Sequence, residues 1–370
     1  MKILESKIVG LLPPAEGNPR NSEGSFLRLD DGSIAFAYSR YTGNSANDHA
    51  ACEIACIYSR DGGETFDTAH PQKLVGAEEY GEKNVMSVTL RRMHNGDIGL
   101  FYLLKQEKER LESRYILRRY RGDFSCPVGE TIIAPDRVPG YYVINNDRVE
   151  ELSSGRWLVM GAYHFTGRQR DGDSFTDPRA LAFTFCSDDD GYTWQQMDAV
   201  LALNQPGSRT GLQEPGCVEL PGGAVYAYFR TDLSYQYESV SADQGESWFQ
   251  PRVSRFSSPR SPMLIKRNEK DGLYWAVWNP VPEYFGKEQP TDYWIGGRTP
   301  LVMAVSEDGV NFSQPVILED DPTRGFCYPA LHFLDDGMLL AYCSGGREEK
   351  GCLNRITIRK IVLDTSEFLN

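Results

Sequence analysis

Charged side chains and a phenol flank the apolar strands of this chain at recurring positions. One set precedes a strand and comprises Arg20, Glu23, Asn84, Asn145, Asn146, Glu214, Arg260 and Tyr328. A second set follows the next strand and comprises Arg40, Lys105, His164, Arg230, Asn279 and Cys343. Guanidinium groups bind a carboxylate through two parallel hydrogen bonds and stay charged. If the fold brings both sets together, their chemistry favours an anion-binding pocket.

Six glycine-containing turns join the strands that carry these residues. The turn glycines are Gly32, Gly96, Gly155, Gly222, Gly272 and Gly337. Several of the turns read Asp-Gly or Asn-Gly between apolar runs, which is a strong signal for a β-hairpin. Because the two strands of a hairpin are antiparallel, the start of the first and the end of the second lie on one face. The register therefore predicts that both sets of polar residues surround a central channel.

A second motif, Ser-x-Asp-x-Gly-x-Thr-Trp, repeats independently of these hairpins. The clearest copy spans residues 187–194, and further copies begin at Ser59, Ser241 and Ser306. The Asp accepts N–H groups of its own turn, the Gly supplies a positive φ, and Ser or Thr adds a hydroxyl bond. Each copy offers one or two carboxylates, fewer than a calcium loop uses. We therefore expect structural turns at the strand ends opposite the polar residues.

The two repeats together predict the fold. Intervals of 50 to 67 residues separate successive turn glycines, and no long segment has helical periodicity. Repeated units of this size are typical of radial architectures. The sequence predicts an all-β chain that forms a six-bladed β-propeller of four-stranded antiparallel blades, as a single domain over residues 1–370.

Composition narrows the range of partners. The formal net charge is -13 with no basic stripe to offset it, which argues against a nucleic-acid partner. No apolar run is long enough to span a membrane. The eight cysteines lack the paired spacing of a zinc site and are expected to be buried thiols, so we expect no metal and no cofactor. Residues 1–10 lack the apolar stretch of a signal peptide, so we expect a cytoplasmic protein, or a secreted or periplasmic one if a leader has been removed.

On these motifs, nearly the whole chain resembles the sialidase (neuraminidase) superfamily. The repeated turns are similar to the Asp boxes of that superfamily, and the order of residues between them is similar as well. The resemblance implies that Arg20, Arg230 and Arg298, from three separate blades, hold the carboxylate of the substrate. We expect Arg40 and Glu23 to lie at the same pocket and contact the substrate.

The resemblance also implies the catalytic residues. Asp48 would be the acid/base, Tyr328 the nucleophile, and Glu214 the group that deprotonates Tyr328. An anionic anomeric centre repels a carboxylate nucleophile, whereas a neutral phenol activated by a carboxylate avoids that repulsion. The implied activity is exo-acting, retaining hydrolysis that releases a terminal sialic acid, or a related acidic sugar, from a glycoconjugate.

Two departures from the family pattern keep alternatives open. The family usually writes its first arginine as Arg-Ile-Pro, whereas residues 20–23 read Arg-Asn-Ser-Glu, and Tyr328 is followed by Pro329. These departures indicate a divergent branch and a different acidic sugar as substrate. One alternative is a hydrolase or lyase that acts on a uronic acid, and another is a non-catalytic glycan-binding propeller. A purely structural ion pair between Arg230 and Glu214 is a further alternative.

Overall fold

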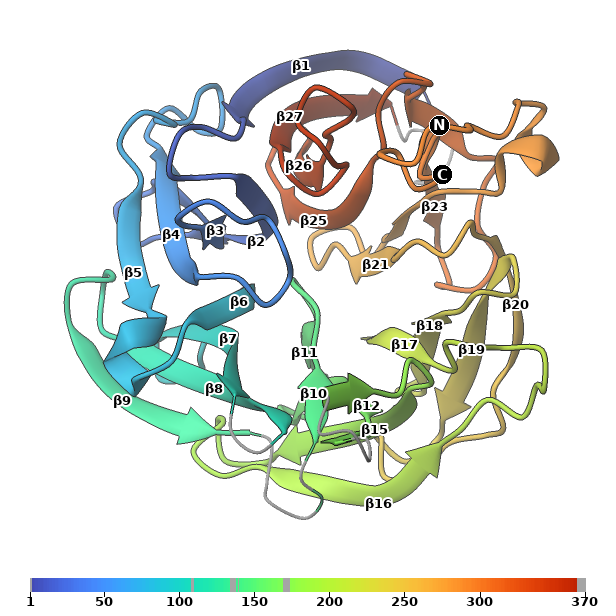
Figure 1. Cartoon of the computed structure of the whole chain (residues 1–370), viewed down its shortest axis with the longest axis horizontal. Helices are drawn as coiled ribbons and strands as arrows, with labels where there is room; N and C mark the ends of the chain where they lie inside the picture. Colours follow the sequence, from blue (N-terminus) through green and yellow to red (C-terminus); the bar gives the residue numbers. More distant parts are fainter. Residues whose placement is uncertain (1, 108–109, 134–137, 139, 169–173, 365–370) are drawn as a thin grey trace.

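The computed structural model describes residues 2–107, 110–133, 138, 140–168 and 174–364 (Figure 1). Within these ranges the chain consists of β-strands and two single-turn 3₁₀ helices, η1 (Ala77–Tyr80) and η2 (Pro282–Phe285), joined by turns and loops. The all-β class predicted from the sequence is confirmed. Neither of these helices has the length and apolarity needed to cross a membrane.

The strands of each sheet are mostly consecutive in sequence and antiparallel. The largest sheet contains β2 (Arg20–Arg28), β3 (Ile34–Tyr41), β4 (Cys52–Ser59), β5 (Gln72–Gly76), β6 (Asn84–Arg92), β7 (Ile98–Glu107), β8 (Leu111–Tyr120) and β9 (Pro127–Ile132). The next contains β10 (Tyr141–Val143), β11 (Val149–Glu151), β12 (Trp157–His164), β15 (Leu181–Ser187) and β16 (Gln195–Leu201). A small two-stranded sheet pairs β13 (Thr166–Arg168) with β14 (Ser174–Thr176).

Three further sheets have four strands each. The first contains β17 (Gln213–Glu219), β18 (Val225–Arg230), β19 (Tyr235–Ser241) and β20 (Arg252–Ser257). The second contains β21 (Leu264–Arg267), β22 (Tyr274–Trp278), β23 (Leu301–Ser306) and β24 (Val316–Glu319). The third joins β25 (Cys327–Phe333), β26 (Met338–Cys343) and β27 (Ile356–Asp364) to the N-terminal strand β1 (Lys2–Leu12).

The sheets are arranged around a common centre (Figure 1). Strands β2, β6, β11, β17, β21 and β25 lie nearest to that centre. The largest sheet divides into two antiparallel halves, which a single parallel bridge between Cys52 and Asn84 connects. Because β1 pairs with β27, the two ends of the described chain lie in one sheet.

Hydrophobic clusters fill the space between neighbouring sheets. Strand β22 is apolar throughout because both of its faces are buried. Trp275 and Val277 join the cluster shared with β25 and β26. Tyr274 and Ala276 join the cluster shared with β17 and β18. Successive side chains of a strand point to opposite faces, so a strand buried on both faces needs apolar residues at every position. A further cluster, which includes Phe36 and Ile358, joins the first sheet to the last one in the sequence.

All six glycine turns predicted from the sequence form hairpins between consecutive strands. The residues that follow these turns begin strands β3, β7, β12, β18, β22 and β26. Gly32 and Gly96 adopt φ of 84° and 87°, which a residue with a side chain rarely adopts. The hairpin register assumed from the sequence is therefore confirmed.

The Asp-containing turns connect the third and fourth strands of their sheets and hold themselves together. In the copy at residues 187–194, Asp189 accepts hydrogen bonds from the Ser187 hydroxyl (2.8 Å), the Thr193 N–H (2.8 Å) and the Thr193 hydroxyl (2.6 Å). Ser187 pairs with Trp157 beside the hairpin turn, so this motif lies at the hairpin end of the sheet. The structure thus confirms that the Asp turns lie opposite the polar strand ends, and their contacts are structural.

Candidate active site

The inner strands share a backbone irregularity that aims side chains toward the centre. One residue other than glycine with positive φ lies within or shortly before each of these strands. Four of the six lie at β-bulges inside the strands, whereas Asp147 and Arg260 precede β11 and β21. These residues are Glu23 (52°), Ser87 (58°), Asp147 (56°), Glu214 (47°), Arg260 (60°) and Tyr328 (54°). A bulge interrupts the alternation of a strand and redirects one side chain, and such strained positions cluster at functional sites. Sequence reasoning found several of these residues but not the bulge that unites them.

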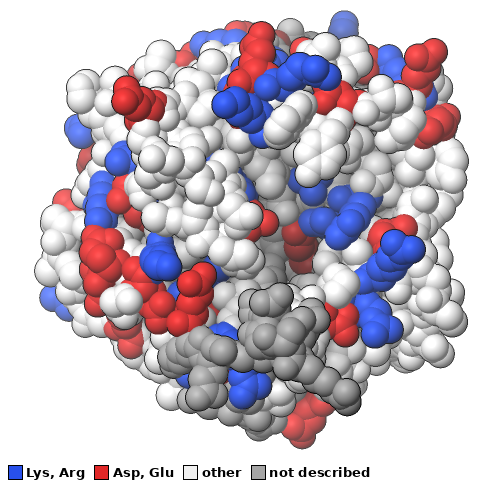
Figure 2. All heavy atoms as spheres, viewed as in Figure 1, with Lys and Arg blue, Asp and Glu red and all other residues white. Residues whose placement is uncertain are grey.

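A cavity of about 410 Å³, called the site cavity below, lies among these strand ends. Its charged and hydroxyl-bearing lining residues are Glu23, Asp48, Ser87, Lys105, Tyr141, His164, Thr176, Glu214, Arg230, Arg260, Arg298 and Tyr328. An adjoining cavity of about 480 Å³ shares Asp48, Arg230, Arg260 and Arg298 with it and is also lined by Arg20. Figure 2 shows a hollow at the centre of the molecule, with basic and acidic side chains around it. The two cavities bring together all the predicted site residues except Arg40.

Tyr328, Glu214 and Arg230 form a connected group in the wall of the site cavity. The Tyr328 hydroxyl donates a hydrogen bond to Glu214 Oε1 (2.7 Å), and Arg230 pairs with the same oxygen (2.5 Å). The second carboxylate oxygen of Glu214, Oε2, is buried and has no hydrogen-bond partner within the described part of the chain. Arg230 also reaches the Tyr328 hydroxyl (3.5 Å). The predicted ion pair between Arg230 and Glu214 therefore exists, but it is shared with a phenol that faces a cavity.

The protonation states of this group suit a nucleophile and its base. Burial and the Glu214 carboxylate raise the pKa of Tyr328 well above its ordinary value, against the opposing effect of Arg230. Burial favours protonation of Glu214 as well, but Arg230, Tyr328 and Arg298 outweigh it and lower the pKa of this carboxyl. A neutral phenol thus donates to an ionised carboxylate, which is the arrangement that general-base activation of a nucleophile requires.

Arg298 and Arg260 are cations without a carboxylate partner among the described residues. Arg298 donates to the Cys327 sulfur (3.1 Å) and lies over the Tyr328 ring, with 5.6 Å between the guanidinium carbon and the ring centre. Arg260 is exposed. Burial lowers the pKa of Arg260, and the charges of Arg230 and Arg298 lower it further, because like charges repel one another. An anion bound between them would relieve that repulsion.

Arg20 is held differently from the other two arginines of the predicted triad. It is buried, pairs with Asp48 (2.5 Å), and stacks on the Tyr41 ring at 4.4 Å. The buried Lys105 donates to the backbone carbonyl of Asp48. Burial lowers the pKa of Lys105 to about 8, although the charge of Asp48 opposes the shift. Arg20 is therefore neutralised by a carboxylate of its own protein.

Arg40 is not among the residues that line either cavity. It pairs with Glu53 (2.9 Å) across β3 and β4. Side chains alternate along a strand, so Arg40 points away from the side on which its neighbour Tyr41 packs under Arg20. The strand end was predicted correctly from the sequence, but the direction of this side chain was not.

The structure adds residues that sequence reasoning did not single out. Ser87 lies at the bulge of β6 and donates to Glu23 Oε2 (2.7 Å). Tyr293 and Trp294 line the adjoining cavity, and Tyr293 is 87% exposed. The run Asp292-Tyr293-Trp294, six residues before Arg298, is the signal that could have indicated an aromatic surface beside the predicted site.

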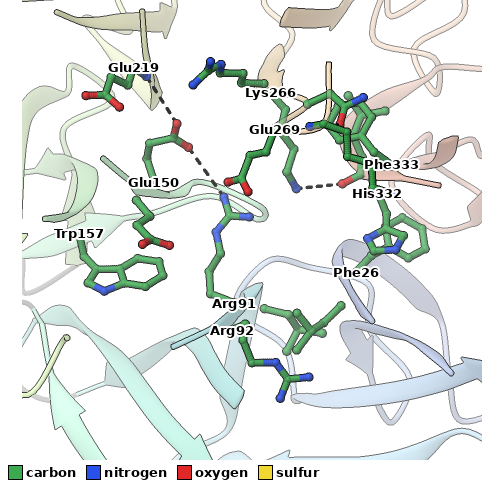
Figure 3. Close-up of a pocket in the computed structure, with 17 residues that line it drawn as sticks. Phe26, Arg91, Arg92, Glu150, Trp157, Glu219, Lys266, Glu269, His332 and Phe333 are labelled. Atoms are coloured by element: carbon green, nitrogen blue, oxygen red, sulfur yellow. Dashed lines mark hydrogen bonds and ion pairs between the residues drawn. The ribbon is translucent and has the colours of Figure 1, made fainter. Parts of the chain in front are cut away.

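A third cavity, of about 390 Å³, lies among the opposite ends of the inner strands (Figure 3). Here the inward charges are mostly paired within the protein. Arg91 donates to the Val149 carbonyl (2.7 Å) and lies 3.9 Å from the Glu150 carboxylate, and Lys266 pairs with Asp147 (2.9 Å). The first of these pairs joins the neighbouring strands β6 and β11, and the second joins β21 to the residue between β10 and β11, so this end has a structural character.

Seven of the eight cysteines are buried, Cys126 is exposed, and all eight are free thiols. Cys327 and Cys352 lie beside Arg298, with Cys327 next to Tyr328 in the chain. Burial raises the pKa of Cys327 to about 12, so this thiol stays protonated next to the site.

Comparison with known proteins concerns the family and the fold of the chain. The family model described as "BNR repeat-like domain" matches residues 69–340. No curated protein matches the chain in sequence. Among solved structures, a protein of unknown function from Dyadobacter fermentans has a TM-score of 0.71 at 15% identity, over 98% of this chain and 99% of that one.

Two sialidase structures are also similar. The intramolecular trans-sialidase of Ruminococcus gnavus, in complex with oseltamivir carboxylate, has a TM-score of 0.67 at 12% identity, over 100% of this chain and 99% of that one. The NanB sialidase of Streptococcus pneumoniae has a TM-score of 0.66 at 11% identity, over 96% of this chain and 70% of that one. At such identities, the likeness shows a shared fold.

Proposed function

We propose that this protein is an exo-acting, retaining glycoside hydrolase that releases a terminal sialic acid, or a related acidic sugar, from a glycoconjugate. The chain belongs to the BNR repeat-like domain family, in the sialidase superfamily, and shares its fold with sialidases. The observation that carries the proposal is the Tyr328 hydroxyl, which donates to Glu214 in the wall of a cavity that Arg230, Arg260 and Arg298 also line.

We infer that residues 1–370 form one domain, a six-bladed β-propeller. The six hairpins, the radial arrangement in Figure 1 and the pairing of β1 with β27 support this inference. The clusters between neighbouring sheets, including the one between the first and the last sheet, support it as well. In such a propeller the bulged residues of the inner strands meet on the axis, where the site cavity lies.

The arginines would bind the carboxylate of the sugar. Arg230 and Arg298 flank Tyr328, so an anionic group held by both would place the anomeric carbon near the phenol. Arg260 adds a cation at the same cavity, and Arg20, paired with Asp48, forms the wall of the adjoining one. The exposed ring of Tyr293 offers an apolar face for the sugars of the departing glycan.

Tyr328 would attack the anomeric carbon while Glu214 takes the phenolic proton. The ionised Glu214 and the neutral phenol are already hydrogen-bonded, so this transfer needs no rearrangement. The attack forms a covalent glycosyl–enzyme intermediate, and a carboxyl group at the cavity protonates the leaving oxygen. Asp48 is the acid that the family resemblance implies, and Glu23 is the other carboxyl group beside it.

The test is turnover and binding by Tyr328→Phe. Wild-type protein is screened with fluorogenic glycosides of sialic acid and of uronic acids, and we expect it to release an acidic sugar. We expect Tyr328→Phe to lower kcat by about 10³-fold or more while the released sugar still binds, because the variant loses the attacking oxygen alone. Tyr192→Phe, in an Asp turn, is the matched control and should keep full activity.

Each other outcome contradicts part of the proposal. Unchanged turnover by Tyr328→Phe would exclude Tyr328 as the nucleophile. Release of a uronic acid but of no sialic acid would show that the substrate is a uronic acid, with the same proposed catalytic residues. Binding of acidic glycans by a wild-type protein that cleaves none of them would identify a glycan-binding propeller.

A further inference from the structure

Glu23 occupies in β2 the position that Glu214 occupies in β17 and Tyr328 in β25. Each is the bulged residue of its inner strand, and the three φ angles lie between 47° and 54°. All three line the site cavity. A backbone strained in this way persists only where the surrounding structure enforces it. The fold therefore presents Glu23 to the cavity by the same device as the proposed nucleophile and its base.

Among the described residues, the contacts of Glu23 leave one carboxyl oxygen without a partner at hydrogen-bond distance. Its side chain is only 4% exposed, and Oε2 accepts the hydrogen bond from Ser87 (2.7 Å). Oε1 lies 3.8 Å from Arg20, beyond hydrogen-bond distance. This oxygen can therefore hold a proton in the cavity, where the leaving oxygen of a substrate would lie.

Asp48, the acid that the resemblance implies, is in the opposite situation. It makes the 2.5 Å ion pair with Arg20, and its side chain is 60% exposed. Against partial desolvation at the cavity, Arg20 and then Lys105 hold the pKa of Asp48 well below its ordinary value. A carboxylate bound in this way holds no proton at neutral pH and is a poor general acid.

We propose that Glu23, rather than Asp48, transfers protons to and from the leaving group in the reaction assigned above, on which this inference rests. In the first step the bond between the anomeric carbon and the leaving oxygen breaks, and that oxygen takes the proton of Glu23. The Tyr328 oxygen forms the new bond to the anomeric carbon, and its proton passes to Glu214.

In the second step Glu23, now a carboxylate, removes a proton from water. The water oxygen bonds to the anomeric carbon as the bond to Tyr328 breaks, and Glu214 returns the proton to the phenolate. Both carboxyl groups then have their starting protonation, and the sugar leaves with the configuration it had in the substrate. Asp48 becomes a positioning residue, because it holds Arg20 away from Glu23.

The electrostatics of the cavity support this division. Burial raises the pKa of Glu23, and the neighbouring charges of Asp48 and Glu214 add to the shift, whereas Arg20 and the Ser87 hydrogen bond oppose it. Since Arg20 is 2.5 Å from Asp48 and 3.8 Å from Glu23, it mainly stabilises the ionised form of Asp48. Two carboxyl groups near one arginine are thus driven to different protonation states.

The experiment compares glycosides of one acidic sugar that differ in the leaving group. A nitrophenol leaves without protonation, whereas an alcohol or a second sugar needs an acid. We expect Glu23→Gln to lower kcat/KM about 10²–10⁴-fold for the alkyl glycoside and less than about tenfold for the nitrophenyl glycoside. Asp48→Asn should affect both glycosides by the same factor. Glu53→Gln, a carboxylate that lines neither cavity, is the matched control and should affect neither.

The pH profile gives a second readout. Wild-type kcat/KM on the alkyl glycoside should fall as the pH rises through the pKa of Glu23, because the acid loses its proton, and this limb should be absent in Glu23→Gln. Equal losses on both glycosides by Glu23→Gln, or a leaving-group dependence confined to Asp48→Asn, would overturn the role of Glu23 alone. Wild-type protein that cleaves neither glycoside would overturn the proposed function itself, and this role with it.

Discussion

Several charges at the site are balanced by an opposite charge of the protein itself, and Arg260 is the clearest exception. It has no ion-pair partner among the described residues, it lines both cavities, and nearby Arg230 and Arg298 lower its pKa in addition to burial. We expect Arg260→Met to raise the KM for the acidic sugar about 5–20-fold with little change in kcat. A charge-assisted hydrogen bond at a partly exposed site contributes about 1–2 kcal/mol to binding, equally in the ground state and the transition state.

Steady-state kinetics at two salt concentrations measure this effect. The matched control is Arg255→Met, which removes the same charge from β20 and from a residue that lines neither cavity. The difference in KM between wild type and Arg260→Met should shrink at high salt, because exposed charges are screened. An unchanged KM, or a loss confined to kcat, would contradict a substrate-binding role for Arg260.

At the residue scale, the sequence predicted which residue types gather but not how they pair. Strand register alone placed Glu214, Arg230 and Tyr328 at one end of their hairpins, and the structure brings them into contact. The pairing of Arg20 with Asp48 was not predictable, because Asp48 lies in a loop whose course no local pattern fixes. The roles of all these residues stay predictions until the variants are measured.

Among the elements, the Asp turns are self-contained, so their contribution to stability can be measured separately. Asp189 accepts three hydrogen bonds within its turn. Desolvation is the largest single effect and raises the pKa of Asp189, but the hydrogen bonds together outweigh it and lower the pKa. We expect Asp189→Ala to lower the free energy of unfolding by about 1–2 kcal/mol, since one backbone N–H and two hydroxyl groups lose their acceptor. Urea unfolding measures the change.

The neighbouring residue supplies the control. Asp188 is exposed and contacts Arg156 (2.7 Å) in a surface ion pair, so Asp188→Ala should cost no more than about 0.5 kcal/mol. Both variants should keep wild-type kcat/KM, because the turn lies at the opposite strand ends from the site cavity. A loss of activity by Asp189→Ala, without a loss of folded protein at the assay temperature, would contradict the purely structural role of the turn.

Local chemistry explains which elements were predictable. A hairpin is specified by a few adjacent residues, so each of the six turn glycines identified a real pair of strands. The sheets were expected to have four strands each, but the inner strand that precedes Gly155 is divided into β10 and β11, with the positive φ of Asp147 between them. Such a bulge depends on packing from neighbouring sheets, and so do the redirected side chains of Glu23 and Glu214.

Considered as a whole, the molecule separates its charges along the central axis. One end gathers several arginines, of which Arg260 and Arg298 have no carboxylate partner in the part of the chain that the structure describes, although the net charge of the chain is -13. The other end, shown in Figure 3, contains mostly paired charges that link inner strands. We therefore propose that the first end binds an anion from outside, whereas the second mainly affects stability. This separation allows the two ends to be tested by different measurements.

Glu150, at the second end, should make the stability of the whole molecule depend on pH. Burial raises its pKa to about 7, although Arg91 opposes the shift. Between pH 4.5, the ordinary pKa, and about pH 7, the folded protein keeps a proton on Glu150 that the unfolded chain has lost. The stability of the fold therefore falls as the pH rises through that window.

Glu150→Gln removes this penalty and should stabilise the protein by about 1–3 kcal/mol at pH 8, with little difference at pH 4.5. Urea unfolding across pH 4.5–8 measures it, with the exposed Glu269→Gln in the same cavity as the control that should show no such trend. A difference between Glu150→Gln and wild type that stays constant over this range would show that Glu150 ionises in the folded protein as it does in the unfolded chain.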